Sequence, residues 1–268
     1  MTGNTQEMQV SAAFSSQATV FDALDKANPV IRWMRHRVQQ HVLRFAKPGG
    51  RVLELNCGTG IDALFFAEKG FTVHATDNAP GMLQELDKKK ENSSYASRIT
   101  AQRLSFNELE KLGREKFDHV FSDFGGLNCA NDLSSVLKKI PPLLEPDGRI
   151  TLVIMPPVCP WEMLQFFKGN FHLARRRFSK SGAGSNVEGT SFKTWYYFPS
   201  YVHKALKNDC RLLALEGLAS VCPPPYMENF AKRFPRTLRF LQRWDERLCA
   251  LPPFRSWADH FIITLEKI

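Results

Sequence analysis

The protein has 268 residues and a mass of 30.6 kDa, with 43% hydrophobic and 24% charged residues. This composition is typical of a globular protein and excludes collagen, a coiled coil and wholesale disorder. No apolar run approaches the ~18–20 residues of a membrane span. The first 25 residues contain no Lys or Arg, so we expect neither a secretory nor a transit segment, and a cytoplasmic protein.

Cysteine spacing and net charge narrow the class of protein further. Six cysteines are scattered along the chain without a CxxC pair, a pattern typical of reduced intracellular thiols, so we expect no disulfide framework and no metal site. The formal charge of +9 and the pI near 9.3 indicate an anionic partner. Nucleic acid, an anionic lipid surface, an acidic carrier protein and an acidic small substrate all fit that charge.

Predicted helices and strands alternate along the first part of the chain. Residues 1–13 are small and polar and predict a frayed tail, and helical spacing of apolar residues follows over 14–46. Beyond the break at 47–50, strands are expected at 51–55, 71–76, 99–104, 117–122 and 149–155, and helices at 61–69, 80–91, 106–113 and 131–144. Strands separated by helix-length segments predict βαβ units and a parallel sheet.

Two segments interrupt this alternation. Residues 157–198 are rich in aromatic and basic side chains, and residues 223–258 form a basic amphipathic stretch that begins with three prolines. Between them, 199–222 returns to a helix followed by a strand, and 259–268 is expected to be the last strand. The pattern predicts one α/β core, beginning over 14–156, that carries two insertions.

The strongest motif is Glu54-Leu55-Asn56-Cys57-Gly58-Thr59-Gly60, between a predicted strand and a predicted helix. Glycine lets the backbone approach a ligand, and the helix start offers unpaired N–H groups to a carboxylate or phosphate. Asp77 ends the next predicted strand, where a carboxylate can accept both hydroxyls of a ribose. These features together predict a ligand that contains adenosine.

Two classes of ligand fit this motif. The run Gly58-Thr59-Gly60-Ile61-Asp62-Ala63 also matches the dinucleotide fingerprint G-x-G-x-x-G/A. Three features favour a ligand other than NAD. Glu54 could meet a ligand ammonium, and about fifty mostly helical residues precede the motif. The third feature is the segment 143–150, which closes the fourth helix and opens the fifth strand. An NAD-dependent or non-catalytic nucleotide-binding protein stays as an alternative.

In these residues the chain resembles class I S-adenosylmethionine-dependent methyltransferases, particularly the small-molecule branch near the ubiquinone and menaquinone biosynthesis enzymes. The resemblance runs from about 30 to 155, resumes at 199–221 and includes the final strand. It implies a Rossmann-like, doubly wound, mostly parallel seven-stranded sheet with an N-terminal helical segment, and S-adenosyl-L-methionine as cofactor. Asn56 stands where the family motif E/D-x-G-x-G-x-G has its first glycine, and asparagine tolerates the left-handed backbone better than other residues.

The resemblance also implies the residues of the cofactor site. It assigns Asp77 to the ribose hydroxyls, Asn78 to the neighbourhood of the adenine and Met82 to packing on the adenine ring. Ser105 stands where the family usually has an aspartate near the adenine amino group. The complete predicted cofactor site is Glu54, Asn56, Cys57, Gly58, Gly60, Asp77, Asn78, Met82, Ser105, Phe106 and Ser122.

Methyl transfer is an in-line displacement at a sulfonium, so alignment of donor and acceptor supplies much of the catalysis. A base is needed only where the acceptor must lose a proton. The candidates for this role are His172, Tyr197 and Asp123, whereas His260 is expected to be structural. The aromatic insertion 157–198 predicts a flap over an apolar acceptor pocket, with simple packing of the insertion on the core as the alternative.

The second insertion carries a stripe of basic residues. If residues 236–250 are helical, Arg236, Arg239, Arg243 and Arg247 lie within about one quarter of the helix circumference, beside an apolar face. One interpretation docks the apolar face on the core and leaves the arginines solvated, partly paired with acidic neighbours. The other is a docking surface for an anionic membrane or an acidic carrier protein.

The sequence lacks the features of a nucleic-acid-binding protein, and this bears on the class of the methyl acceptor. No appended nucleic-acid module and no long basic face with stacking aromatics is visible in the sequence. We therefore expect a small-molecule acceptor rather than nucleic acid, and a methyltransferase acting on RNA or another macromolecule is the alternative.

Overall fold

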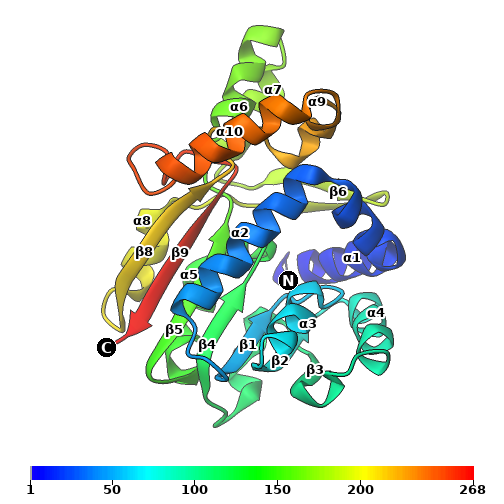
Figure 1. Ribbon diagram of the computed structural model, residues 1–268, viewed down its shortest axis with the longest axis vertical. Coiled ribbons are helices and arrows are strands. Elements are labelled where there is room, and N and C mark those ends of the chain that lie inside the picture. The colour runs from blue at the N-terminus through cyan, green and yellow to red at the C-terminus, as the bar shows by residue number, and fades with distance from the viewer. Residues whose placement is uncertain (1) are drawn as a thin grey trace.

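The computed structural model describes residues 2–268, which are built around a seven-stranded sheet (Figure 1). The strands lie in the order β3-β2-β1-β4-β5-β9-β8. Their bounds are β1 Arg51–Leu55, β2 Thr72–Asp77, β3 Ile99–Arg103, β4 Phe117–Ser122, β5 Leu144–Ile154, β8 Cys210–Leu218 and β9 His260–Lys267. Strands β1 to β5 are parallel, and β9 runs antiparallel to both of its neighbours. The predicted Rossmann-like, mostly parallel sheet is confirmed.

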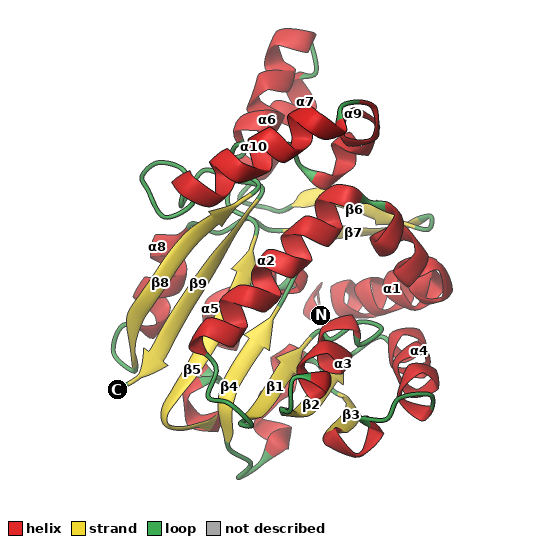
Figure 2. Ribbon diagram, in the orientation of Figure 1, coloured by secondary structure: helices red, strands yellow, loops and turns green. Residues whose placement is uncertain are grey.

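Helices cover both faces of the sheet (Figure 2). One face carries α2 Pro29–Phe45, α3 Ile61–Glu68 and α4 Pro80–Glu91, and the other carries α5 Leu133–Lys138 and α8 Pro199–Leu206. The alternation of side chains along a strand produces this division. Val52 packs in the cluster of α2 and α3, while Leu53 packs in the cluster of α5 and α8.

The N-terminal residues form a helix rather than a tail. Helix α1 spans Thr2–Ala27, and Asn28 then caps α2. The predicted tail at 1–13 is therefore wrong for the described residues, and Met1 lies outside them. The reason is tertiary, because the Gln6 amide donates to the backbone oxygen of Lys193 at 2.8 Å, a partner 187 residues away.

Two helices predicted in the core are shorter than expected. The segment predicted at 106–113 is a 3-10 helix, Phe106–Leu112. The helix predicted at 131–144 ends at Lys138, and a 3-10 turn covers Pro141–Leu143. Proline removes a backbone donor and clashes with the preceding turn, so the pair of prolines ends the α-helix and lets β5 begin at Leu144.

The two insertions gather at one end of the molecule, at the top of Figure 1. The first holds α6 Pro160–Met163, the 3-10 segment Leu164–Lys168, α7 Phe171–Arg175, and a hairpin of β6 Ala183–Val187 and β7 Thr190–Thr194. The second holds α9 Glu228–Arg233 and α10 Pro235–Leu248. Within residues 2–268, none of the helices has the length and hydropathy that a membrane crossing requires.

Candidate active site

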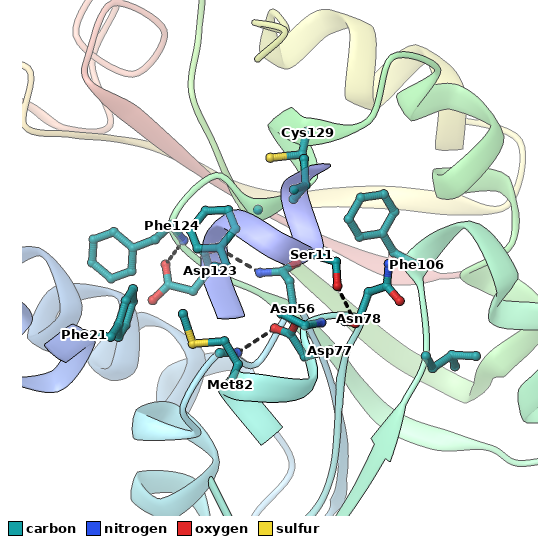
Figure 3. A pocket seen from close by; sticks show the side chains of 16 residues that line it. Ser11, Phe21, Asn56, Asp77, Asn78, Met82, Phe106, Asp123, Phe124 and Cys129 are labelled. Atoms are coloured by element: carbon teal, nitrogen blue, oxygen red, sulfur yellow. Dashed lines mark hydrogen bonds between the residues drawn. The ribbon is translucent and has the colours of Figure 1, made fainter. Parts of the chain in front are cut away.

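A cavity lies at the carboxyl ends of β1, β2 and β4, beneath helix α1 (Figure 3). It brings together six of the predicted cofactor residues, which are Asn56, Gly58, Asp77, Asn78, Met82 and Phe106. The cover of the cavity comes from α1, through Val10, Ser11, Phe14 and Phe21. Sequence reasoning missed these four residues, because neither the small polar composition of 1–13 nor the helical spacing of apolar residues after it is a signal of a ligand site.

Asp77 ends β2 and faces the cavity. Its Oδ2 accepts from the backbone N–H of Gly58 at 2.9 Å, and its Oδ1 accepts from the backbone N–H of Ala79 at 2.8 Å. Burial raises the pKa of Asp77, and these N–H donors partly offset that rise. The carboxylate thus ties the glycine loop to β2, and its remaining lone pairs can accept from ligand hydroxyls.

The glycine loop has left-handed backbone at three positions. Asn56, Gly58 and Gly60 have φ values of +49°, +55° and +76°. A Cβ atom on Gly60 would lie 2.2 Å from Cδ1 of Leu86 in α4. Only glycine therefore allows the start of α3 to pack this closely on α4.

Asn56 connects the ends of β1 and β4. Its Oδ1 accepts from Oγ of Ser122 at 2.7 Å, and its Nδ2 donates to the backbone oxygen of Asp123 at 3.2 Å. Ser122 is therefore a positioning residue for Asn56 and is not among the residues that line the cavity. The side chain of Asn56 thus has two partners at the end of β4.

A buried group of charges lies beside the cavity around Arg35 of α2. The guanidinium donates to Asp62, lies 3.7 Å from Oδ2 of Asp123, and donates to Asp25 of α1 at 2.5 Å. Glu54 is buried in the same place, and burial, with the charge of Asp62, raises its pKa well above the usual range. Arg35 was missed from the sequence, because nothing in the helical stretch that precedes the motif distinguishes it from other arginines.

Two carboxylate oxygens of this group have no hydrogen-bond partner among the described residues. They are Oε2 of Glu54 and Oδ2 of Asp123, and both are fully buried. Burial, together with the charge of Asp62, also raises the pKa of Asp123 well above the usual range. Buried polar atoms are nearly always paired. These two oxygens are therefore available to accept hydrogen bonds from a cationic group of a ligand.

Two predicted cofactor residues lie behind the cavity wall. Ser105 caps the 3-10 helix by accepting from the backbone N–H of Asn107 at 3.0 Å. Cys57 is buried under the glycine loop, and that burial raises the pKa of its thiol well above the usual range. In place of Ser105, its neighbours Leu104 and Phe106 reach the cavity.

Of the three candidate bases, Asp123 lies at the cavity and the other two do not. His172 is exposed on α7, over a separate surface groove that it shares with Arg175. Tyr197 is buried in the core and donates its hydroxyl to the backbone oxygen of Ala130. The structure thus places neither His172 nor Tyr197 among the residues that line the cavity.

The aromatic residues of 157–198 do not line the cavity. Phe192 packs on Phe14 of α1, with ring centroids 5.9 Å apart, and so supports the cover of the cavity. The aromatic walls come from α1 and the strand ends, through Phe14, Phe21, Phe106 and Phe124. The expectation that the flap walls the pocket is therefore wrong, since its aromatic side chains pack on the core or point outward.

A buried ion network ties the flap to the sheet. Arg177 donates to Glu162 of α6 and to Asp259, at 2.7 Å in each case. Asp259 also accepts from Nδ1 of His260 at 2.9 Å. Cys159, Glu162 and Asp259 lie close enough to share a metal ion, but the guanidinium of Arg177 already supplies the positive charge between the two carboxylates.

The charges around Asp259 keep it ionised. Burial alone would raise its pKa, but His260 and Arg177 together hold the pKa of Asp259 below its usual range. A carboxylate bonded to Nδ1 selects the histidine tautomer whose Nε2 is unprotonated. His260 therefore has the arrangement of a proton acceptor oriented by an acid.

Comparison with known proteins finds similarity to methyltransferases over part of the chain. Residues 52–148 match the family model of a methyltransferase domain. The chain is 30% identical over 141 residues to a protein of Geobacillus sp. (strain WCH70) named as a methyltransferase, which covers 51% of this chain and 55% of the relative. It is 30% identical over 124 residues to the demethylmenaquinone methyltransferase of Beutenbergia cavernae, covering 46% of this chain and 48% of that protein. The chain thus spans about half the length of the curated relatives it matches.

Solved structures share the fold over most of the chain. A protein of Listeria monocytogenes described as an S-adenosylmethionine-dependent methyltransferase has a TM-score of 0.61 and 20% identity, and the match covers 88% of this chain and 99% of that chain. The chain therefore shares the fold of this structure, and residues 52–148 match a methyltransferase domain.

Proposed function

We propose that this protein transfers a methyl group from S-adenosyl-L-methionine to a small aromatic or apolar acceptor. The observation that carries the proposal is the cavity itself, which combines the cofactor residues with aromatic walls under the cover of α1. A covered apolar cavity suits a small molecule better than a base within a nucleic acid. One curated relative is named for a quinone precursor, demethylmenaquinone, which is an acceptor of this chemical class.

The residues of the cavity fit the cofactor. Asp77 would accept from the ribose hydroxyls, and Met82 and Phe106 would contact the adenine from the cavity wall. Oδ2 of Asp123, at the cavity, and Oε2 of Glu54, beside it, would accept from the ammonium of the methionine part, whose charge would favour the ionised form of both groups. When bound, S-adenosyl-L-methionine supplies an electrophilic methyl group on a sulfonium.

The acceptor would lie on the aromatic side of the cavity. Figure 3 shows Phe21 and Phe124 beside Asp123, on the other side of the pocket from Phe106. Phe124 has a φ of +42° and lies under the guanidinium of Arg35, 4.5 Å from the ring centroid. The ring is therefore held in place by a neighbour from α2, which pre-organises that wall of the cavity.

The test of this function is transfer of a labelled methyl group from S-adenosyl-L-methionine to a cell extract that is separated into small-molecule, protein and RNA fractions. We expect the label in the small-molecule fraction, in an organic-soluble product. Label in RNA, with binding that weakens steeply with salt, would establish the macromolecule alternative instead. A larger thermal shift with NAD than with S-adenosylhomocysteine would contradict the cofactor assignment.

Helix α1 is expected to control cofactor binding, and Gly81 tests this. A Cβ atom on Gly81 in α4 would lie 2.6 Å from the backbone oxygen of Ser15 in α1. Gly81→Val should therefore lift α1 and weaken S-adenosylhomocysteine binding about tenfold or more, because the cavity loses its cover. Calorimetry measures the affinity, and Gly184→Val is the control, since a Cβ there meets no atom within 4 Å. Equal affinities in both variants would contradict the role of α1.

Within this function, His260 is the residue placed to accept a proton from the acceptor. Its Nε2 lies 3.3 Å from the position a Cβ on Gly125 would take, between two residues that line the cavity, Phe124 and Gly126. Its ring meets the ring of Phe124 edge-on, with centroids 6.0 Å apart. His260 is buried and is not itself among the residues that line the cavity, so its Nε2 lies behind Gly125, next to the aromatic wall.

For an acceptor that must lose a proton, His260→Gln should lower kcat about 100-fold or more. The affinity for S-adenosylhomocysteine should stay within about twofold, because His260 would act on the methyl acceptor and would not contact the cofactor. His203→Gln on the exposed side of α8 serves as the control. A wild-type kcat in His260→Gln would show that the residue only packs beside Phe124.

A further inference from the structure

Helix α10 has a buried side and an outer side of opposite character. Leu238 and Asp245 are its buried residues. At about 100° per residue, the opposite side carries the four arginines and two aromatic residues. Phe240 and Trp244 are 59% and 40% exposed, and the exposed arginines are Arg236, Arg239, Arg243 and Arg247.

The acid of this helix faces the core and leaves the arginines unpaired. Asp245 accepts from the backbone N–H groups of Val221 and Cys222 at 2.7 and 2.9 Å and pairs with Arg37 at 3.1 Å. Glu246 accepts from the indole of Trp33. Across the part of the chain that the structure describes, none of the four arginines forms an ion pair. The interpretation that pairs the arginines partly with Asp245 and Glu246 is therefore wrong in that detail, whereas its solvated arginines agree with the four exposed side chains.

The tip of the first insertion exposes a second group of side chains. Phe167 is 84% exposed, the largest exposed fraction among the large hydrophobic residues of the described chain. Its neighbours Met163, Leu164, Phe166 and Phe171 are each between 44% and 54% exposed. The acid of this segment, Glu162, is buried in the network with Arg177. An exposed apolar cluster without acidic residues marks a site of interaction.

The base of the apolar tip and the arginine helix are joined through Val221. The indole of Trp161, at the base of the tip, donates to the backbone oxygen of Val221 at 3.2 Å. The backbone N–H of Val221 in turn donates to Asp245 of α10 at 2.7 Å. Figure 1 shows both elements at the same end of the molecule. They therefore approach a partner together.

We propose that this end of the molecule docks on an anionic lipid membrane. The arginines of α10 match lipid phosphates in charge, and aromatic side chains between them suit the interface of a bilayer. Met163 and Leu164 favour lipid over RNA, because aliphatic side chains offer no face for base stacking. The docking is independent of the methyl acceptor, although an acceptor dissolved in the membrane would reach the enzyme at this surface.

The test is sedimentation of the full chain with vesicles. We expect binding to phosphatidylcholine vesicles that contain ~30% phosphatidylglycerol, and at least about tenfold weaker binding to pure phosphatidylcholine. Binding should weaken between about 50 and 500 mM salt, since exposed charges are screened. Changing the four arginines of α10 to glutamine should lower the affinity about 100-fold, and Leu164→Asp with Phe167→Asp should lower it about tenfold or more.

A matched control removes the same charge elsewhere. Arg114, Lys138, Lys204 and Lys207 are exposed and form no ion pair within the described residues, and their change to glutamine should leave vesicle binding within about threefold. Equal losses in the two quadruple variants would show that only net charge matters, and would overturn the proposed surface. So would a wild-type protein that ignores anionic vesicles at low salt, or one that prefers RNA or an acidic carrier protein. Unchanged melting temperature and S-adenosylhomocysteine affinity establish that each variant is folded.

Discussion

Asp77→Ala is expected to weaken S-adenosylhomocysteine binding by about 1.5–3 kcal/mol, or about 10- to 150-fold. The carboxylate faces the cavity and also accepts from the N–H of Gly58 at 2.9 Å. Its loss removes the acceptor for the ribose hydroxyls and releases the glycine loop, so both effects act in the same direction. Isothermal calorimetry well below the melting temperature measures the change.

The control for Asp77 is Asp87→Ala on the same side of the sheet. Asp87 is half-exposed and pairs with Lys90 at 3.4 Å, so its removal should leave the affinity within about twofold. Because Asp77 also holds Ala79 and Gly58, we expect Asp77→Ala to lower the free energy of unfolding by about 1–3 kcal/mol. An unchanged affinity of Asp77→Ala for S-adenosylhomocysteine would contradict the assignment of Asp77 to the ribose, whatever its free energy of unfolding.

Arg35→Met is expected to cause the largest loss of stability, about 3–5 kcal/mol in the free energy of unfolding. The guanidinium is buried among Asp25, Asp62 and Asp123. Methionine keeps apolar bulk under Phe124 but leaves these carboxylates without their cation, and uncompensated buried charge is costly. Arg32→Met, on an exposed position of the same helix, is the control and should change the free energy of unfolding by less than about 0.5 kcal/mol.

The pH dependence of the Arg35→Met defect tests its cause. Burial already raises the pKa of Asp123 above its usual range with Arg35 present, and removal of the cation raises it further. A group whose folded pKa is raised prefers its protonated form in the folded state. The defect should therefore be largest above the folded pKa of Asp123 and shrink as the pH falls through it. A defect that is constant between pH 8 and about pH 5 would point to lost packing in place of lost charge.

The sequence alone determined the parallel sheet and the centre of the cofactor site. Strands separated by helix-length segments leave few arrangements, because parallel strands require crossovers of one hand. Within that sheet, the motif from Glu54 to Gly60 and the position of Asp77 depend on local geometry. A strand, a tight left-handed loop and a helix start are set by residues close in the chain, and parallel strands bring their carboxyl ends to one edge.

The tertiary structure alone decided which distant residues complete the site. Helix α1 becomes the cover of the cavity because its partners, Asn78, Gly81 and Lys193, lie far along the chain. Arg35 enters the acidic group, and Tyr197 leaves the list of bases, for the same reason. The periodicity of apolar residues shows that a helix or strand has two different sides. It does not show which neighbour covers each side, and that neighbour decides which side is buried.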